Sequence, residues 1–408
     1  MTESVQTEHR IIVIGAGLAA AKAVETLRDE GFKGAVTLIG DEIERPYERP
    51  SLSKGFLQGT TAEDELFVHS SDWYAEHAVD TRFGQAAVSI DRAARTVTLD
   101  FGETIPYEQL LLAMGARPRT LDLPNADAAG VFTLRRLSDS DRIRTAFHRA
   151  ESLVVIGAGW IGLETAAAAR AEGLDVTVLE SAALPLQRVL GDELAGHFAA
   201  LHRRHGVDLR TSVSVTGLEQ TDGHVSVVHV GEESIAADMV IIGVGITPNV
   251  ELATAAGLDV DDGIRVDERL RTSDPAVFAA GDVANARHTT LGPLRVEHWD
   301  NAIRQGRLAA RSMLGHDVAY DWQPYFYTDQ FDLGMEYVGR GSPDDDVVIR
   351  GDREAGEFIA FWLRDRVVTA AMNVNVWDVN DELRALIGAS ADPAKLADPD
   401  VPLPSSEA

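Results

Sequence analysis

The order of apolar and polar positions at the start of the chain predicts one supersecondary unit. Residues 10–14 (RIIVI) form an apolar, largely β-branched run, and residues 35–39 (AVTLI) form another. Between them lie a glycine turn at 15–20 (GAGLAA) and a segment with helical spacing of apolar residues at 21–30. Strand, glycine turn, helix and strand in this order predict a βαβ unit.

The same order occurs a second time, later in the chain. The apolar strand 153–156 is followed by the turn 157–162 (GAGWIG), by an alanine-rich helix that ends near Ala171, and by the strand 176–179. The two turns are too far apart in sequence for a solenoid repeat. They therefore predict two separate nucleotide-binding domains in one chain.

Glycine and proline mark where the chain passes between these domains. A buried strand near Leu110 leaves through Gly115 and Pro118, and the strand Met239–Gly243 leads to Thr247-Pro248. Glycine and proline at the end of a strand are typical of a loop or a domain boundary. We therefore interpret the second βαβ unit as an insertion into the first domain.

The composition of the chain changes again from about Tyr325. Aromatic residues become frequent, and the runs 347–350, 358–363 and 367–372 are rich in β-branched and aromatic residues, which predicts successive strands of an antiparallel sheet. From Pro393 the chain is rich in Pro, Asp and Ser, and we expect a disordered tail. The expected domains are an FAD-binding domain in two parts (8–115 and 247–324), an inserted NAD-binding domain (116–246), and a C-terminal α+β domain (325–408).

The charge of the chain restricts its partners. It carries 37 basic and 65 acidic residues, for a formal net charge of −28. This balance argues against nucleic acid and anionic lipid as partners. Solubility alone is a sufficient explanation of the total charge.

The chain has no cysteine. Disulfides, thiolate metal ligands and mechanisms that pass through a redox-active thiol are therefore excluded. Glu3 and Glu8 interrupt the N-terminal segment, and no apolar stretch reaches the 18 or more residues that span a bilayer. We expect a cytoplasmic protein with no membrane segment and, because no histidines have metal-ligand spacing, no metal site.

The two glycine turns have the form that binds a pyrophosphate. The first glycine permits a tight bend, the second allows the backbone to approach the phosphates, and the helix N-terminus donates amides to them. An acidic residue follows the second strand of each unit, Asp41 in the first and Glu180 in the second, and each can accept ribose hydroxyls. Glu180 favours NAD over NADP because a carboxylate repels a 2′-phosphate, although a plain surface acid is the alternative. Arg188, eight residues further on, is a candidate for phosphate contact.

The order of motifs resembles the ferredoxin reductases of oxygenase systems, the putidaredoxin reductase family of two-dinucleotide-binding-domain flavoproteins. The resemblance covers nearly the whole chain. Its most specific pieces are Gly40-Asp41, Arg49-Pro50-Ser51-Leu52-Ser53-Lys54, Ala113-Met114-Gly115, Ala279-Ala280-Gly281-Asp282-Val283 and Glu297-His298-Trp299-Asp300-Asn301-Ala302. It implies an α/β fold with two Rossmann-like, glutathione-reductase-like domains, and it implies FAD and NADH as cofactors.

The resemblance also implies which residues contact FAD. The pyrophosphate would lie at the first glycine turn, the adenosine at Asp41 and Ala87, the ribityl chain at Asp282, and the isoalloxazine beside Trp299. The full set of implied FAD contacts is Gly15, Gly17, Leu18, Ala19, Asp41, Arg49, Lys54, Ala87, Ala113, Arg135, Gly281, Asp282 and Trp299.

For NADH the resemblance implies the second glycine turn and its neighbours. The implied contacts are Gly157, Gly159, Trp160, Ile161, Gly162, Glu164, Glu180, Arg188 and Gly245. Lys54 and Glu164 are the implied catalytic pair, because a cation near the flavin stabilises negative charge on the reduced ring. A surface lysine and a solvated helix residue are the respective alternatives.

Two positions depart from the family pattern. Met114 stands where the family usually has threonine, and Trp160 stands where a smaller residue or tyrosine is more frequent. A tryptophan there either contacts the nicotinamide or packs in the core. We therefore leave the effect of both positions open.

The implied activity is hydride transfer from NADH to FAD, followed by single-electron transfer to a two-iron ferredoxin that feeds a haem monooxygenase or a Rieske dioxygenase. Rubredoxin reductase and monodehydroascorbate reductase are alternatives that also work without a protein thiol. An NADH-sensing flavoprotein of the apoptosis-inducing-factor kind is an alternative from a different functional class. The sequence leaves monomer or dimer open.

A basic helix face is a candidate docking surface. Residues 301–314 have helical spacing, with Arg304, Arg307 and Arg311 on one face. In an acidic protein this face can receive an acidic ferredoxin, and Arg307 matches a docking arginine of the family. A solvated helix face is the competing and slightly favoured interpretation.

Overall fold

The computed structural model describes residues 9–403, and the chain divides into two compact units. The first unit contains residues 9–48, 63–117 and 247–322, and the second contains residues 49–62, 118–246 and 323–403. Two of the five junctions lie within short strands, β8 (Ala116–Pro118) and β17 (Ile246–Pro248). Glu3 and Glu8 and the last five residues of the predicted tail lie outside the described residues.

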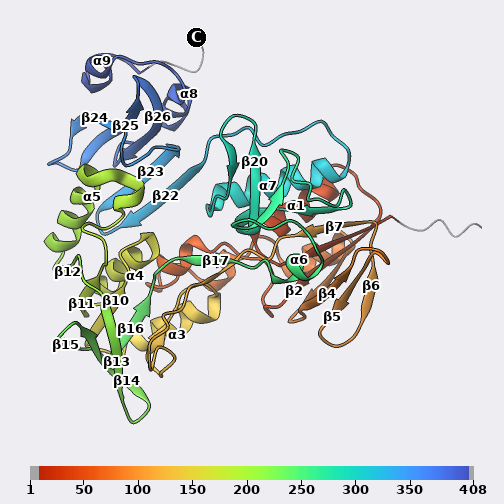
Figure 1. Ribbon diagram of the computed structural model, residues 1–408, viewed down its shortest axis with the longest axis horizontal. Coiled ribbons are helices and arrows are strands. Elements are labelled where there is room, and N and C mark those ends of the chain that lie inside the picture. The colour runs from red at the N-terminus through yellow and green to blue at the C-terminus, as the bar shows by residue number, and fades with distance from the viewer. Residues whose placement is uncertain (1–8, 404–408) are drawn as a thin grey trace, which may run out of the picture. The chain divides into compact units, whose positions relative to one another are not determined.

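A five-stranded parallel sheet is the centre of the first unit. Its order is β19 (Val277–Ala279), β7 (Gln109–Leu112), β1 (Arg10–Ile14), β2 (Ala35–Gly40) and β3 (Val79–Phe83). The central strand β1 is buried from Ile11 onward because both faces of a parallel sheet are covered. Helices α1 (Leu18–Asp29) and α7 (Trp299–Met313) pack side by side (Figure 1). A Cβ at Gly306 of α7 would lie 2.3 Å from the carbonyl oxygen of Ala19, so this close crossing requires glycine.

Smaller elements complete the first unit. Strands β4 (Ala87–Asp91), β5 (Thr96–Leu99) and β6 (Thr104–Pro106) form an antiparallel sheet, and β18 (Ile264–Val266), β20 (Ala284–His288) and β21 (Gly292–Leu294) form a mixed one. The short helical elements are η2 (Glu63–Leu66), α2 (Ser71–Glu76), α6 (Glu251–Ala255) and η3 (Gly281–Val283).

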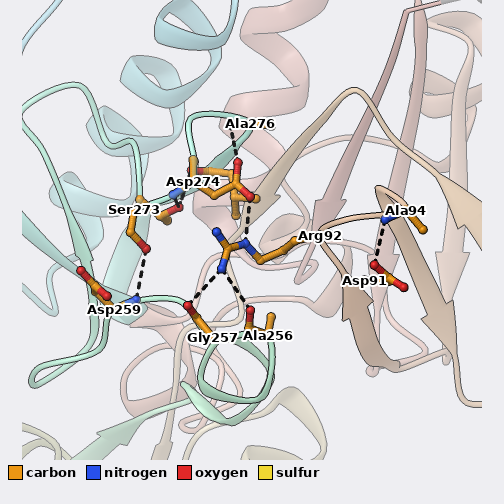
Figure 2. Close-up of polar contacts among 11 residues, drawn as sticks. Asp91, Arg92, Ala94, Ala256, Gly257, Asp259, Ser273, Asp274 and Ala276 are labelled. Carbon is orange, nitrogen blue, oxygen red and sulfur yellow. Dashed lines mark hydrogen bonds and ion pairs between the residues drawn. The ribbon is translucent and has the colours of Figure 1, made fainter.

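The side chain of Arg92 connects the turn after β4 to two other segments of the first unit, as Figure 2 shows. Its Nε atom lies 2.8 Å from Oδ2 of Asp274, and its Nη1 atom donates to the carbonyl oxygens of Ala256 and Gly257. Burial opposes ionisation of Asp274, but the hydrogen bonds from Arg92 and from the backbone of Ala276 outweigh it and lower the pKa of the carboxyl group. Arg92 therefore fastens the turn after β4 to the end of α6 and to the loop before β19.

The second unit is also built on a parallel sheet. The strand order is β12 (Asp208–Arg210), β11 (Asp175–Leu179), β10 (Ser152–Ile156), β16 (Met239–Ile242) and β9 (Val131–Phe132). Its helices are η1 (Pro50–Ser53), α3 (Leu137–Phe147), α4 (Trp160–Ala171) and α5 (Gln187–Arg204). Strands β13 (Val215–Thr221), β14 (His224–Val230) and β15 (Glu233–Ala236) form a three-stranded antiparallel sheet.

The C-terminal part of the second unit is an antiparallel sheet (Figure 1, blue end of the colour bar). Its order is β22 (Tyr325–Gln330), β23 (Leu333–Gly339), β26 (Val367–Val374), β25 (Glu357–Arg364) and β24 (Asp346–Asp352). Helix α8 (Asn380–Leu386) lies at β23 and β26, and α9 (Pro393–Ala397) lies at β24. The predicted α/β class, with two Rossmann-like units and a C-terminal antiparallel sheet, is therefore confirmed.

The prediction of disorder from Pro393 is wrong for the described part of the tail. The side chain of Asp392 accepts from the amide of Ala394 and begins α9. The guanidinium of Arg350 donates to the carbonyl oxygens of Asp398, Pro399 and Val401. Composition gave no sign of these contacts, because one arginine from β24 satisfies backbone groups of the tail.

Candidate functional site

The first glycine of each turn is required by the protein backbone itself. Gly15 has φ = 104° and Gly157 has φ = 101°, in the region that residues with a Cβ rarely adopt. A Cβ at Gly15 would lie 2.2 Å from the carbonyl oxygen of Ala113, and one at Gly157 would lie 2.4 Å from that of Gly243. In each unit the turn therefore lies against the end of the neighbouring parallel strand.

The second glycine of each turn has a different environment. A Cβ at Gly17 would meet no atom within 4 Å, and one at Gly159 would meet only the carbonyl oxygen of Gly243, at 4.0 Å. Both backbones are extended, with φ of −90° and −78°. Protein packing therefore does not explain these glycines, whereas close approach of a pyrophosphate does.

Both turns lead directly into a helix. Among the described residues no side chain caps the N-terminus of α1 or of α4, at Gly17 or Gly159 respectively. The first amides of each helix thus remain directed outward, where the positive end of the helix dipole favours an anion. The structure fits a dinucleotide at both places. The predicted helix start at Ala21 is wrong by one turn, because Leu18, Ala19 and Ala20 already have helical backbone.

The two acidic residues that follow the second strands differ in exposure. Asp41 is exposed just after β2. Glu180, just after β11, is half-buried, and its carboxylate accepts from the amides of Ala158 and Ala182, each at 2.7 Å. Glu180 therefore lies at the second glycine turn, and its hydrogen bond to Ala158 of that turn fixes its position.

The other residues predicted to bind FAD fall in both units. Ala87, Ala113, Gly281, Asp282 and Trp299 belong to the first unit, where Ala113 follows β7 and Asp282 lies in η3. Gly281 approaches the first helix, since a Cβ there would lie 3.1 Å from the Cβ of Ala19, and its amide donates to Gln305 of α7 at 2.8 Å.

Arg49, Lys54 and Arg135 belong to the second unit. The guanidinium of Arg49 donates from Nη1 to the carbonyl oxygen of Arg135 at 2.5 Å. These two predicted residues are thus brought together.

The structure brings Lys54 and Glu164 into contact. Nζ of Lys54 lies 2.8 Å from Oε1 of Glu164, and the Glu164 side chain is only 3% exposed. Oε2 of Glu164 accepts from the hydroxyl of Ser53. Glu164 is on the second turn of α4, and Ser53 ends η1, so the pair joins the second glycine-turn helix to the segment around Lys54. The alternatives of a surface lysine and a solvated glutamate are excluded.

Three further residues that no sequence motif singled out lie in this neighbourhood. Thr328 of β22 donates its hydroxyl to Oε1 of Glu164 at 2.5 Å, and Ser53 donates to Oε2. The ring of Tyr327 lies 5.4 Å from Nζ of Lys54, within the range of a cation–π contact. Ser53 is in the same sequence motif as Lys54, so the sequence could have indicated it as a site residue. Thr328 and Tyr327 come from an aromatic strand whose facing partners the sequence does not reveal.

Trp160 packs within the second unit. Its ring lies 5.6 Å from Phe198 of α5, edge to face, and 5.0 Å from Phe326 of β22. These contacts support the packing alternative left open by the sequence. Ile161 beside it is 43% exposed, although apolar, on the first turn of α4.

The other residues predicted to contact NADH differ in their packing and exposure. Gly162 is required by packing, because a Cβ there would lie 2.1 Å from the carbonyl oxygen of Gly157. Gly245 is exposed with φ = 103°, and its carbonyl oxygen accepts from the amide of Arg119. Arg188 is exposed in the first turn of α5.

The three arginines predicted as a docking strip all lie on α7, and each faces a carboxylate. Nε of Arg304 lies 2.8 Å from Asp300, Nη2 of Arg307 lies 4.0 Å from Glu25, and Nε of Arg311 lies 2.8 Å from Glu30. Their side chains are 40–49% exposed. The strip is accessible, but its positive charge is partly offset by acidic neighbours.

Within residues 9–403, no cluster of His, Cys, Asp or Glu side chains is arranged to hold a metal ion. In the same part of the chain, none of the helices combines the length and apolar character needed to cross a bilayer.

Two family models match the chain. The model described as Pyridine nucleotide-disulphide oxidoreductase matches residues 9–306, and the model described as Reductase C-terminal matches residues 325–406. The chain is 39% identical over 396 residues to the anthranilate 1,2-dioxygenase system ferredoxin-NAD(+) reductase component of Burkholderia cepacia, covering 96% of this chain and 98% of that one. It is 36% identical over 373 residues to putidaredoxin reductase of Pseudomonas putida, covering 90% and 88%.

Two solved structures are similar to this chain over nearly its whole length. The ferredoxin reductase for the CYP199A2 system from Rhodopseudomonas palustris matches with a TM-score of 0.93 and 36% identity, covering 97% of this chain and 98% of that one. A chain of the covalent putidaredoxin reductase-putidaredoxin complex matches with a TM-score of 0.93 and 35% identity, covering 97% of each.

Proposed function

The chain belongs to the pyridine nucleotide-disulphide oxidoreductase family, and from this premise we propose that it is an FAD-containing, NADH-dependent ferredoxin reductase. The observation that carries the proposal is the pair of open, uncapped glycine turns, at Gly17 and Gly159, in a chain without cysteine. Two dinucleotide sites without a thiol favour electron transfer to an external acceptor. The relatives named for ferredoxins support a ferredoxin as that acceptor.

FAD, when bound, supplies the ability to accept a hydride from NADH and to release the two electrons singly. In this proposal the first glycine turn and Asp41 hold FAD, together with Arg49, Lys54, Ala87, Ala113, Arg135, Gly281, Asp282 and Trp299. The second glycine turn and Glu180 hold NADH, with Ile161, Glu164, Arg188 and Gly245 nearby.

Lys54 and Glu164 work as an electrostatic pair in this scheme. The ammonium of Lys54 stabilises negative charge on the reduced ring system, and Glu164 holds that ammonium in position. No general base is required of the chain, because the reaction moves a hydride and electrons.

The partner in this proposal is a two-iron ferredoxin that feeds a haem monooxygenase or a Rieske dioxygenase. The ferredoxin docks on the face of α7 that carries Arg304, Arg307 and Arg311. Arg307 is the best placed of the three, because its contact to a carboxylate is the longest, at 4.0 Å. The proposal also includes a cytoplasmic location. It further includes three domains, which are an interrupted FAD domain, an inserted NAD domain and a C-terminal domain.

Stopped-flow absorbance tests the activity. The purified yellow protein is mixed anaerobically with NADH and then with a two-iron ferredoxin. We expect rapid loss of flavin absorbance and rapid return on addition of the ferredoxin. A reduced protein that ferredoxin leaves reduced, but that rubredoxin or monodehydroascorbate oxidises, would assign it to one of those reductases. A long-lived reduced complex with every acceptor would favour an NADH-sensing flavoprotein instead.

Charge reversal tests the docking face. We expect Arg307→Glu to slow ferredoxin reduction and to weaken its salt dependence, while reduction of the flavin by NADH stays as in the wild type. Arg353→Glu is the matched control, since Arg353 is similarly exposed and also pairs with a glutamate, Glu193. An equal effect of the two variants, or none from Arg307→Glu, rejects docking at α7.

A further inference from the structure

A row of buried polar side chains connects Glu164 to helix α5. The hydroxyl of Thr328 donates to Oε1 of Glu164 at 2.5 Å, and Nε2 of Gln330 donates to the Thr328 oxygen at 3.1 Å. Oε1 of Gln330 lies 2.8 Å from Nε2 of His202 on α5. Thr328, Gln330 and His202 are each at most 1% exposed, and all belong to the second unit.

The chemistry of these groups fixes the direction of every hydrogen bond. The Thr328 hydroxyl gives its proton to Glu164, so its oxygen accepts from the amide nitrogen of Gln330. The amide oxygen of Gln330 can only accept, so His202 carries its proton on Nε2 and donates. All the donors in the row therefore point toward Glu164.

Glu164 needs such donors because its carboxylate is nearly inaccessible to water. A buried carboxylate is costly unless it is paired and hydrogen-bonded. Lys54 supplies one charged donor, and the hydroxyls of Ser53 and Thr328 supply two neutral ones. Without Gln330, the Thr328 oxygen would lack its own donor and the hydroxyl would be free to rotate away from Glu164.

We propose that Gln330 and His202 are positioning residues that orient the Thr328 hydroxyl toward Glu164 and thereby fix where that carboxylate holds the Lys54 ammonium. This inference rests on the proposed function, in which the ammonium lies beside the flavin. It assigns a role to a histidine and a glutamine that belong to no nucleotide-binding motif.

His202 acts as a fixed donor and not as a proton relay. Burial lowers its pKa to about 4, the hydrogen bond to Gln330 opposes this shift, and the nearby His205 adds to it. The imidazole is thus neutral in the neutral pH range, with its one proton committed to Gln330.

Two matched pairs of variants test the proposal. Thr328→Val and His202→Leu remove a donor, whereas Thr328→Ser and His202→Gln retain one. His205→Leu is the control at the C-cap of α5, since the ring of His205 stacks on Phe331 and contacts Asp332. Each holoenzyme is assayed for FAD content, for the midpoint potential of its flavin, and for kcat and KM with NADH and ferricyanide, an acceptor that needs no docking.

We expect Thr328→Val, which removes a hydrogen bond to a charged group, to lower kcat about tenfold. His202→Leu removes a hydrogen bond to a neutral amide, so we expect a smaller loss of about fivefold. KM for NADH and FAD content should stay unchanged in both variants. Their flavin potential is expected to shift to more negative values, because Glu164 draws the Lys54 ammonium closer when it loses another donor. The two donor-retaining variants and His205→Leu are expected to match the wild type in kcat and in potential.

Three results would overturn the inference. The first is an unchanged potential and kcat in Thr328→Val and His202→Leu. The second is an equal effect of His205→Leu, which would show general damage to α5. The third is failure of His202→Gln to restore the wild-type values, which would indicate proton transfer by the imidazole. Should the His202 variants not fold, Gln330→Met decides in their place, because it removes the donor to Thr328, and wild-type potential and kcat in this variant would reject the proposal. A wild-type protein that binds no FAD or reduces no ferricyanide would reject the proposed function instead.

Discussion

The ammonium of Lys54 lies 2.8 Å from Oε1 of Glu164, although the two residues belong to motifs far apart in the sequence. Lys54 follows η1, and Glu164 is on the second turn of α4. The Lys54 side chain keeps 16% exposure, whereas Glu164 keeps 3%. The pair therefore joins an accessible cation to a buried anion.

A double-mutant cycle can measure the strength of this pair. We expect Glu164→Gln to destabilise the protein by about 3 kcal/mol, because it removes the buried partner of a charge. Adding Lys54→Met should recover part of the loss, with a coupling energy of about 1–3 kcal/mol. Urea denaturation of the four proteins measures both quantities. The exposed pair Arg353 and Glu193 is the control, with expected coupling below about 1 kcal/mol. Strict additivity at Lys54 and Glu164 would contradict this expectation.

The two glycines of the first turn should respond differently to alanine. Gly15→Ala places a Cβ 2.2 Å from the carbonyl oxygen of Ala113 at φ = 104°, so we expect a loss of stability of about 1–3 kcal/mol or more. Gly17→Ala meets open space and should leave the stability of the apoprotein unchanged, but it should weaken FAD binding. Thermal unfolding of the apoprotein and FAD titration separate the two effects. Normal FAD affinity in Gly17→Ala would show that the cofactor does not approach this backbone.

Glu180 should control the choice between NADH and NADPH. Glu180→Ser removes the carboxylate that accepts from Ala158 and Ala182, and it removes its repulsion of a 2′-phosphate. We expect the ratio of kcat/KM for NADH to that for NADPH to fall about tenfold, equivalent to one good hydrogen bond. Steady-state kinetics with both nucleotides measures the ratio, and Asp175→Ser at the exposed start of β11 is the control. A ratio that does not change would place the ribose elsewhere.

His202 should make stability depend on pH in mildly acidic solution. Its pKa is about 4 in the folded protein against an ordinary value of 6.5, so the unfolded chain binds the proton more tightly. Stability is then fully present above pH 6.5 and is lost as the pH falls toward 4, by about 3 kcal/mol in total. His202→Gln should flatten this part of the profile. His197, whose pKa burial also lowers to about 4, should leave a residual slope.

The pH profile is measured by urea denaturation at a series of pH values. His205→Gln is the matched control, since His205 is more exposed on the same helix. If wild type and His202→Gln lose stability in parallel between pH 6.5 and 4, His202 is not buried as a neutral ring.

The sequence was sufficient for the βαβ units because their signal is local. The five-residue strands before Gly15 and before Gly157 each contain four apolar residues and are parallel to their neighbours, and the glycine turns connect them to helices in the order predicted. The starts of the two helices were predicted about one turn too late, because the last three residues of each six-residue glycine motif already have helical backbone. The ordered segment 393–403 was missed, because its stability depends on Arg350, which is distant in sequence.

By itself, the sequence determined the fold class, the two dinucleotide turns and the absence of thiol chemistry. These three features follow from residue type and from spacing along short stretches of chain, whereas the pairing of Lys54 with Glu164 was implied only by the resemblance to a known family. Only the tertiary structure decided that Ser53 and Thr328 hydrogen-bond to Glu164. It also decided that Gln330 donates to Thr328 and that His202 contacts Gln330. The carboxylates that face the arginines of α7 were likewise visible only in the structure. The reason is that a hydrogen bond depends on which side chains meet in space. The packing of strands and helices brings together residues that are far apart in sequence and that no periodic pattern of residues connects.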